Sequence, residues 1–346
     1  MKAKVYFELS LDITQNLLHN KEEEMGKIDN VTREYVRNPE VFADICNAAV
    51  FGGNQVIKAE TLTERDTTAE VLLRSNGGKN TVSVQRYRDV LKEWVTMDAP
   101  SATIAIFGIE NQADIHYAMV SRSYLYDALN YENQVKYISD MNVRLGRVEA
   151  KAPSYRHFLK TDRLKPVITI VVYWGAKKWD GARSLHELLD FSGQDDLKNF
   201  VPDYRMPLVV PAEIEDFERY KTNLRYILPF IKYSDSRDAM QELLNRYRES
   251  YSVTDRTTAD LLKVLTNINI QANAKGEIDM CKAWDDQRNA GREEGIKEGI
   301  KEGRESIVKE LIKLGQPLGI IKEVSRFTED KIRELAKSIG VPVTEE

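Results

Sequence analysis

The sequence predicts an α/β fold followed by an α-helical C-terminal region, on three observations. Residues 166–175, PVITIVVYWG, form a continuous run rich in β-branched side chains, as expected of a strand buried on both faces. Helical and strand-like patterns precede this run in the order helix, strand, strand, helix. Residues 213–265 are helical and amphipathic in pattern, and a chain of 346 residues suffices for one core with a helical appendage or for two cores.

The first predicted helix begins at Asn38-Pro39, a capping residue followed by a first-turn proline. Apolar side chains then recur at helical spacing until Gly52-Gly53, a pair typical of a helix end. Glu40 and Asp44 are four residues apart and therefore share one face of this helix. Two acids on one face indicate a candidate ligand site, although simple solvent exposure explains such a pair as well.

Two consecutive strands are predicted next, within residues 81–94 and 103–112. A turn at residues 98–101 separates them, and consecutive segments of this kind usually pair as a hairpin. The first segment carries Asp89, and the second ends in Glu110 and Gln112 with one residue between them. Because strand side chains alternate between faces, Glu110 and Gln112 leave the sheet on the same side. Hairpin pairing would then bring Asp89 close to Glu110.

A second long helix is predicted over residues 118–144, and Arg122 lies in its first turns. Residues 122–178 contain eleven Lys or Arg and five Asp or Glu, a net charge of +6, whereas the whole chain carries −5. A surface that binds DNA would therefore have to be local to this stretch. A short helix at residues 185–191 and a short edge strand bounded by prolines at 207–211 complete the predicted α/β part.

The C-terminal part changes character after residue 275. Gly291, Gly295, Gly299 and Gly303 recur every fourth residue among alternating Glu and Lys. This repeat indicates either a helix that packs closely against another surface or a charged linker. Residues 307–340 predict two amphipathic helices ending near glycines, and the lack of a basic recognition face favours helix pairing or self-association over the reading of DNA.

Several classes of site are excluded by the residues that the sequence lacks. No Ser or Cys sits in a nucleophile elbow, the two Cys and four His are scattered, and no glycine motif that binds phosphate follows a strand. No apolar run approaches the roughly 20 residues that span a bilayer. We therefore expect a cytoplasmic protein without membrane contact. The codons for residues 21–25, KEEEM, are compatible with a purine-rich ribosome-binding sequence, which suggests that translation begins at Met25.

Oxygen ligation is the chemistry that remains. Asp89 and Glu110 on neighbouring strands, with Asp44 or Glu40 from the preceding helix, would suit Mg²⁺, which takes few protein oxygens and keeps waters. Such a metal can polarise a phosphoryl oxygen and lower the pKa of an attacking water. The competing interpretation is that these are ordinary exposed acids at strand ends.

The residues in these positions also resemble a known family. A helix, a strand with Asp, a strand that ends in Glu-x-Gln and a helix with Arg and Tyr together resemble the PD-(D/E)XK nuclease superfamily. The resemblance is closest to the Rpn family of recombination-promoting nucleases and transposase-like proteins. It is carried by RYRDVLKEW, IFGIENQADIHYAMVSRSYLYDALNY, PVITIVVYWGAKKWDG and RSLHELLDF, covers about residues 38–191, and extends to the tail rich in Gly and Glu.

The resemblance implies a restriction-endonuclease-like central mixed sheet flanked by helices, and a Mg²⁺-dependent DNA endonuclease. It places the metal-binding acids at Asp89 and Glu110, with Asp44 slightly preferred over Glu40 as the acid from the first helix. The third position of the motif falls on Gln112, where the superfamily usually has a Lys that orients water and stabilises negative charge. Arg122 is the candidate to supply that missing positive charge.

The expected organisation is an uncertain N-terminal extension (1–30), a nuclease-like domain (31–212), a helical region (213–274) and a charged helical tail (275–346). The expected function is hydrolysis of DNA phosphodiester bonds by a metal-activated water, with the DNA backbone held by nonspecific contacts to the basic stretch. The competing hypothesis is a catalytically weak or inactive interaction protein with the same fold, which forms homo-oligomers through its C-terminal helices.

Overall fold

The structure, a computed structural model, describes residues 26–65, 68–74, 81–87, 89–96, 102–266, 268, 270 and 278–345. Residues 68–74 and 81–87 are described by their backbone. The expected start at Met25 and the turn predicted at 98–101 lie outside the described residues.

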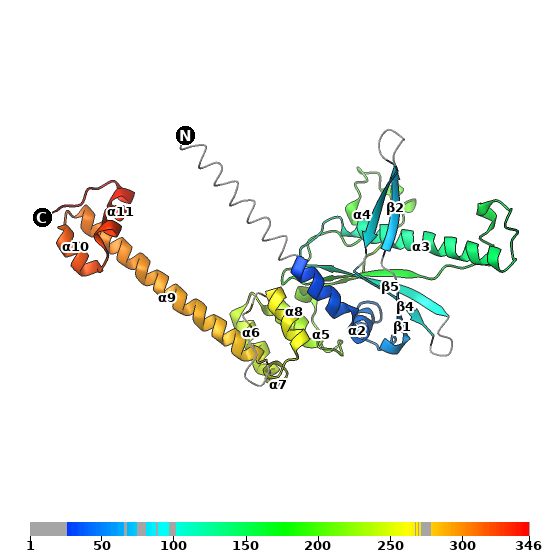
Figure 1. Ribbon diagram of the computed structural model, residues 1–346, viewed down its shortest axis with the longest axis horizontal. Helices are drawn as coiled ribbons and strands as arrows, with labels where there is room; N and C mark the ends of the chain where they lie inside the picture. The colour runs from blue at the N-terminus through cyan, green and yellow to red at the C-terminus, as the bar shows by residue number, and fades with distance from the viewer. Residues whose placement is uncertain are drawn as a thin grey trace. The chain divides into compact units, whose positions relative to one another are not determined.

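A five-stranded mixed sheet forms the centre of the α/β part, in the order β1-β4-β5-β6-β7 (Figure 1). Its strands are Leu62–Glu64 (β1), Val90–Val95 (β4), Thr103–Gln112 (β5), Val167–Tyr173 (β6) and Leu208–Val209 (β7). β1, β4 and β5 pair antiparallel, and β5, β6 and β7 pair parallel. The predicted α/β fold with a central mixed sheet is confirmed, including the hairpin and the short edge strand.

The strand predicted within residues 81–94 is in fact two strands in different sheets. Thr68–Arg74 (β2) and Thr81–Tyr87 (β3) pair with each other in a separate two-stranded sheet, and the chain joins the central sheet at β4. Asp89 therefore stands at the point of entry into the central sheet, immediately before β4. A strand pattern by itself does not reveal such a change of sheet, because both strands have the same side-chain period.

Helices make up most of the rest of the described chain. Residues 26–37 are helical. The α-helices that follow are Pro39–Val50 (α2), Met119–Arg144 (α3), Leu185–Leu188 (α4), Leu224–Tyr233 (α5), Arg237–Arg246 (α6), Arg248–Ser252 (α7), Arg256–Thr266 (α8), Met280–Lys313 (α9), Leu318–Ser325 (α10) and Glu329–Ile339 (α11). Short 3-10 helices occupy Ala59–Thr61, Ser154–Arg156, Asp195–Asn199 and Pro211–Glu213.

Helices cover both faces of the central sheet, with α3 on one side and α2 on the other (Figure 1). On the α3 side, buried side chains of β4, β5 and β6 pack with Tyr131, while the first turn of α3 packs on the end of β6. On the α2 side, the ring of Phe51 meets that of Trp94, which meets that of Phe107. The alternation predicted for β5 places Glu110 on the α3 side and Asn111 on the α2 side.

Contacts divide the chain into two units, Met1–Met280 and Cys281–Glu346. In the second unit the end of α9 packs with α10 and α11 around a core that includes Val308, Ile321 and Leu335. The helix ends predicted near Gly315 and Gly340 are confirmed, since both glycines have left-handed backbone angles (φ +71° and +69°). The glycine repeat lies within α9, so it is helical. Among the described residues, no helix is long and apolar enough to cross a membrane.

Candidate active site

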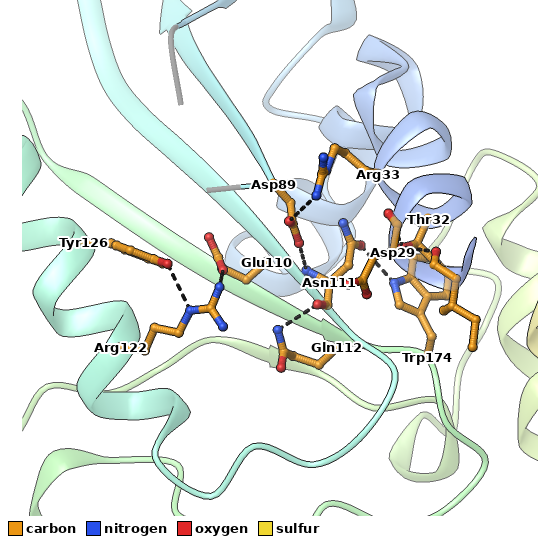
Figure 2. A network of polar contacts seen from close by, with 11 residues as sticks. Asp29, Thr32, Arg33, Asp89, Glu110, Asn111, Gln112, Arg122, Tyr126 and Trp174 are labelled. Atoms are coloured by element: carbon orange, nitrogen blue, oxygen red, sulfur yellow. Dashed lines mark hydrogen bonds and ion pairs between the residues drawn. The ribbon is translucent and has the colours of Figure 1, made fainter. Parts of the chain in front are cut away.

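The ends of β4 and β5 carry the two acids that the sequence singled out. In the β4–β5 pairing Val90 stands opposite Ile109, so continuing this register by one residue places Asp89 opposite Glu110. Asp89 is fixed by the strand itself, because the backbone N–H of Asn111 donates to its Oδ2 at 2.7 Å. The hairpin therefore positions both acids, as its sequence predicted (Figure 2).

Glu110 is fully buried and forms an ion pair with Arg122, whose Nη2 lies 3.4 Å from Glu110 Oε2. Arg122 comes from the first turn of α3, the helix that follows β5 and covers this face of the sheet. Its Nε donates to the Tyr126 hydroxyl at 3.0 Å, one helical turn further on. Burial would lower the pKa of Arg122, but Glu110 and the Tyr126 hydroxyl outweigh it, so the pKa is raised and the guanidinium stays charged.

Gln112 lies two residues beyond Glu110 on the same side of the strand. Its Nε2 donates to the backbone carbonyl of Asn111 at 2.7 Å, which turns the amide toward the strand end. The side chain is half-buried, so its carbonyl oxygen can accept a hydrogen bond from a water. An amide in this position orients by hydrogen bonding and supplies no charge.

Asn111 was not singled out by the sequence analysis, yet it ties the site to the opposite face of the sheet. Its Oδ1 accepts a hydrogen bond of 2.9 Å from Trp174 Nε1, at the end of β6. The ring of Trp174 in turn packs edge-on against Tyr35 of helix 26–37. The backbone segment that holds Asp89 is therefore anchored from behind by two aromatic side chains.

Asp44, the acid preferred for the first-helix position, does not join the other two. It is buried on α2, and its carboxylate accepts hydrogen bonds from the backbone N–H groups of Lys221 and Thr222 (2.8–3.0 Å) and from the Thr222 hydroxyl (2.6 Å). Three donors thus engage both of its oxygens, so the structure assigns Asp44 to holding the segment before α5. Glu40, the alternative, is exposed on α2.

The helix that faces Asp89 is instead the one at residues 26–37, which carries Asp29 and Arg33 (Figure 2). Arg33 Nη2 lies 3.5 Å from Asp89 Oδ1. Burial, and next the negative charge of Asp89, raise the pKa of the Asp29 carboxyl. The i,i+4 spacing of Asp29 and Arg33 was the available signal, but residues 1–30 had been predicted to be an extension outside the domain.

The donors present fit a hard cation that needs few protein ligands. Asp89 and Glu110 offer carboxylate oxygens from adjoining strands, which suits Mg²⁺ with its retained waters. Among the described residues, no three His, Cys, Asp or Glu side chains are grouped closely enough to hold a metal ion by themselves. A Mg²⁺ ion held here would take its remaining ligands from waters or substrate oxygens.

The basic stretch predicted at residues 122–178 is exposed for most of its length. Ten of its eleven Lys and Arg side chains are exposed, and Arg122 is half-buried. Lys136 and Arg144 lie on α3, six of the others lie between α3 and β6, and Lys177 and Lys178 follow β6. The helical rise puts Arg144 about 33 Å from Arg122. The exposed basic side chains are thus spread over α3, the segment that follows it and the loop after β6.

A mixed sheet whose hairpin presents two acids beneath an arginine from the next helix is the framework of a nuclease-like α/β protein. Residues 110–261 match the family model described as "Putative transposase, YhgA-like". Over this segment the chain is similar to that family, which is the Rpn type of transposase-like protein, and the resemblance inferred from the sequence is confirmed. The family supports a nuclease-like function. No curated protein and no solved structure matches the chain.

Proposed function

We propose that this protein is a Mg²⁺-dependent DNA endonuclease that hydrolyses phosphodiester bonds. The observation that carries the proposal is that the β4–β5 register places Asp89 opposite Glu110 at the end of the hairpin, with Arg122 paired to Glu110. The transposase-like family of residues 110–261 supports the same class of reaction, because transposition requires strand cleavage.

Asp89 and Glu110 would hold the metal through their carboxylate oxygens. When bound, Mg²⁺ supplies charge that polarises the phosphoryl oxygen and lowers the pKa of the attacking water. The hydrogen bond from the backbone of Asn111 keeps Asp89 in place without consuming both of its oxygens. Asp29 adds negative charge beside Asp89 and favours a cation at this position.

Gln112 and Arg122 would act on the reacting groups. The Gln112 amide orients the attacking water by hydrogen bonding, in the position where a lysine is usual in the superfamily. Arg122 supplies the positive charge that Gln112 lacks, and its side chain remains 36% exposed, so a phosphate can reach it. The exposed basic side chains of the stretch 122–178 would hold the DNA backbone by contacts that do not depend on sequence.

Nicking of supercoiled plasmid tests the proposal. The wild-type chain should nick with Mg²⁺ and not with EDTA, and Asp89→Asn and Glu110→Gln should each lower the rate at least about 100-fold, since electrostatic stabilisation of this kind is worth that much. Glu132→Gln on the exposed surface of α3 removes one charge as well and serves as the matched control, with an unchanged rate.

Two results would contradict the proposal. Folded wild-type protein that leaves plasmid intact with Mg²⁺, Mn²⁺ and Co²⁺ would favour the non-catalytic alternative, in which the chain assembles through its tail. Nicking that survives in both acid variants would place the catalytic centre elsewhere. Arg122→Ala separately tests the proposed role of that residue, which is dismissed if cleavage is retained.

A further inference from the structure

Each of the two acids at the strand ends is paired with an arginine from a different helix (Figure 2). Asp89 pairs with Arg33 of helix 26–37, and Glu110 pairs with Arg122 of α3. The cationic groups therefore stand at the oxygens that would bind a metal ion. Figure 2 shows that the two side-chain pairs extend in opposite directions, Asp89 toward Arg33 and Glu110 toward Arg122.

Both ion pairs are loose, and both arginines remain accessible. The closest N–O distances are 3.5 Å for Arg33 and 3.4 Å for Arg122, well above the 2.7–2.9 Å typical of a charge-assisted hydrogen bond. The acids are more enclosed than their partners: the side chains of Asp89 and Glu110 are 18% and 0% exposed, those of Arg33 and Arg122 43% and 36%. The arginines can therefore leave while the acids stay in place.

The charges in this cluster act on one another as a group. Burial and then Asp89 raise the pKa of Asp29, and the positive charges of Arg33 and Arg122 partly oppose this rise. Burial would lower the pKa of Arg122, but Glu110, the Tyr126 hydroxyl and Asp89 together raise it. Three acids and two arginines leave one net negative charge. A divalent cation that entered with both arginines in place would meet two positive charges at close range, and its affinity would be reduced by that repulsion.

Phosphate groups provide a way to remove this repulsion. Arginine binds phosphate with two parallel hydrogen bonds, a stronger geometry than either ion pair observed here. Mg²⁺ is commonly held by one or two carboxylates together with substrate phosphates. A phosphate placed over the hairpin end would thus draw the arginines away from the acids and offer the metal a further ligand.

We propose that Arg33 and Arg122 occupy the cation positions of the acid pair in the absence of substrate and transfer to a nucleic-acid phosphate when it binds. Binding of the phosphodiester backbone and of the metal ion are thereby coupled, and each strengthens the other. The inference rests on the proposed function in one respect, namely that Asp89 and Glu110 are the metal ligands. Arg33 then becomes a further substrate-binding residue, contributed by a helix outside the segment that matches the family.

Metal affinity measured without turnover tests the coupling. Mn²⁺, detected by its electron paramagnetic resonance signal, is titrated into the full chain with and without a short DNA duplex whose phosphates at the centre resist hydrolysis. The duplex should tighten Mn²⁺ binding by about 10-fold, within the usual range of coupling. A duplex with uncharged methylphosphonate linkages at its centre should leave the affinity for Mn²⁺ unchanged.

Replacing either arginine should raise the affinity for Mn²⁺ in the absence of DNA, and should thereby reduce the coupling between metal and DNA binding. Arg33→Gln and, independently, Arg122→Gln should bind Mn²⁺ several-fold more tightly than the wild-type chain without DNA, and the further gain with DNA should shrink. Arg33→Lys keeps the charge and should retain most of the coupling. Arg37→Gln is the matched control, because Arg37 lies on the same helix and pairs at 2.7 Å with Glu64, away from the acid pair.

The outcomes separate this inference from the proposed function. The coupling is overturned, and the metal site left intact, if Mn²⁺ binding requires Asp89 and Glu110 but is equally tight with and without the duplex. The affinity for Mn²⁺ would in that case also be unchanged in Arg33→Gln and Arg122→Gln. Binding that is insensitive to Asp89→Asn and Glu110→Gln overturns the metal site itself, and the coupling with it. Circular dichroism of each variant verifies that it is folded.

Discussion

At the scale of single residues, hydrogen bonding distinguishes structural acids from candidate metal ligands more clearly than position on a helix does. Asp44 and Asp89 both lie in the α/β part and both accept backbone hydrogen bonds. Asp44 accepts from three donors on Lys221 and Thr222, whereas Asp89 has one backbone bond and one loose ion pair. Only the second arrangement leaves an oxygen for a ligand.

We predict that Asp44→Ala lowers the free energy of unfolding by about 2–4 kcal/mol, because it leaves the N–H groups of Lys221 and Thr222 without their charged acceptor. Urea unfolding measures this change. Glu40→Ala, at the exposed position on the same face of α2, should be nearly neutral. Equal losses of unfolding free energy in Asp44→Ala and Glu40→Ala would contradict the structural role of Asp44. Loss of Mn²⁺ binding in a folded Asp44→Asn variant would contradict it as well.

A second residue-scale prediction concerns Lys92, a buried lysine on the α2 side of β4. Its side chain is 3% exposed and its Nζ lies 5.6 Å from the centre of the Phe42 ring. Burial lowers the pKa of Lys92 below its usual value, only partly opposed by Glu64. At neutral pH the charged form is therefore less favourable in the folded than in the unfolded chain, and this cost falls as the pH rises toward the unfolded pKa of about 10.4.

Lys92→Met should raise the free energy of unfolding at pH 7 by about 1 kcal/mol, since an apolar side chain of similar length replaces a buried charge. The difference in free energy of unfolding between Lys92→Met and the wild type should narrow between pH 7 and pH 10, because the wild-type lysine becomes neutral. Denaturant titrations at several pH values measure the difference. Lys58→Met, at an exposed position, is the control, and its stability relative to wild type should not change with pH in this way. If the gain in unfolding free energy of Lys92→Met stays constant or grows with pH, burial of a charged Lys92 is refuted.

At the scale of elements, the end of α2 and the loop before α5 hold each other in place. Asp44 accepts hydrogen bonds from this loop, and Gly53, just after α2, approaches it closely as well. A Cβ on Gly53 would lie 2.9 Å from the Cβ of Arg219. Gly52 also has a positive φ (+61°), but a Cβ there would meet no atom of the described residues within 4 Å.

The two glycines therefore make a matched pair for measurement. Gly52→Ala should lower the free energy of unfolding by about 1 kcal/mol, the cost of the left-handed conformation. Gly53→Ala carries a similar backbone cost at φ +91° and adds the contact with Arg219, so we expect about 2–3 kcal/mol. Thermal or urea unfolding compares them. A smaller loss for Gly53→Ala than for Gly52→Ala would show that the loop at Arg219 yields freely.

At the scale of the whole molecule, the two units have separate cores and the candidate site lies within the first. The second unit packs α10 and α11 on the end of α9 around its own apolar residues. Along α9, Ile296, Ile300 and Ile307 are each more than half exposed. These are the side chains that self-association through the tail, as in the alternative function, would cover.

Damage to the core of the second unit should therefore leave cleavage unaffected. Ile321→Ala removes a fully buried side chain and should destabilise that unit by about 2–4 kcal/mol. Hydrogen exchange should then accelerate in α10 and α11 but not in β5 and β6, while plasmid nicking stays at the wild-type rate. Ile320→Ala, at the neighbouring position that is 46% exposed, is the control. A parallel loss of nicking in Ile321→Ala alone would show that the units act together.

The sequence by itself determined the elements whose signal is local. Continuous β-branched residues predicted β6, alternation predicted the faces of β5, and capping residues and glycines predicted the bounds of α2 and the ends of the C-terminal helices. The hairpin connection was enough to place Asp89 beside Glu110, and Arg122 followed from its position in the first turn of the next helix. These predictions held because each depends on residues close together in the chain.

The tertiary structure decided everything that depends on which distant segments meet. Asp29, and not Asp44, is the helical acid that faces Asp89. Packing decides this, because residues 26–37 pack behind the strand ends through Tyr35 and Trp174. The pairing of Arg33 with Asp89 and the anchoring of Asn111 likewise join residues more than 50 positions apart. Sequence periodicity records which face of an element is apolar, but it does not record the partner that will cover that face.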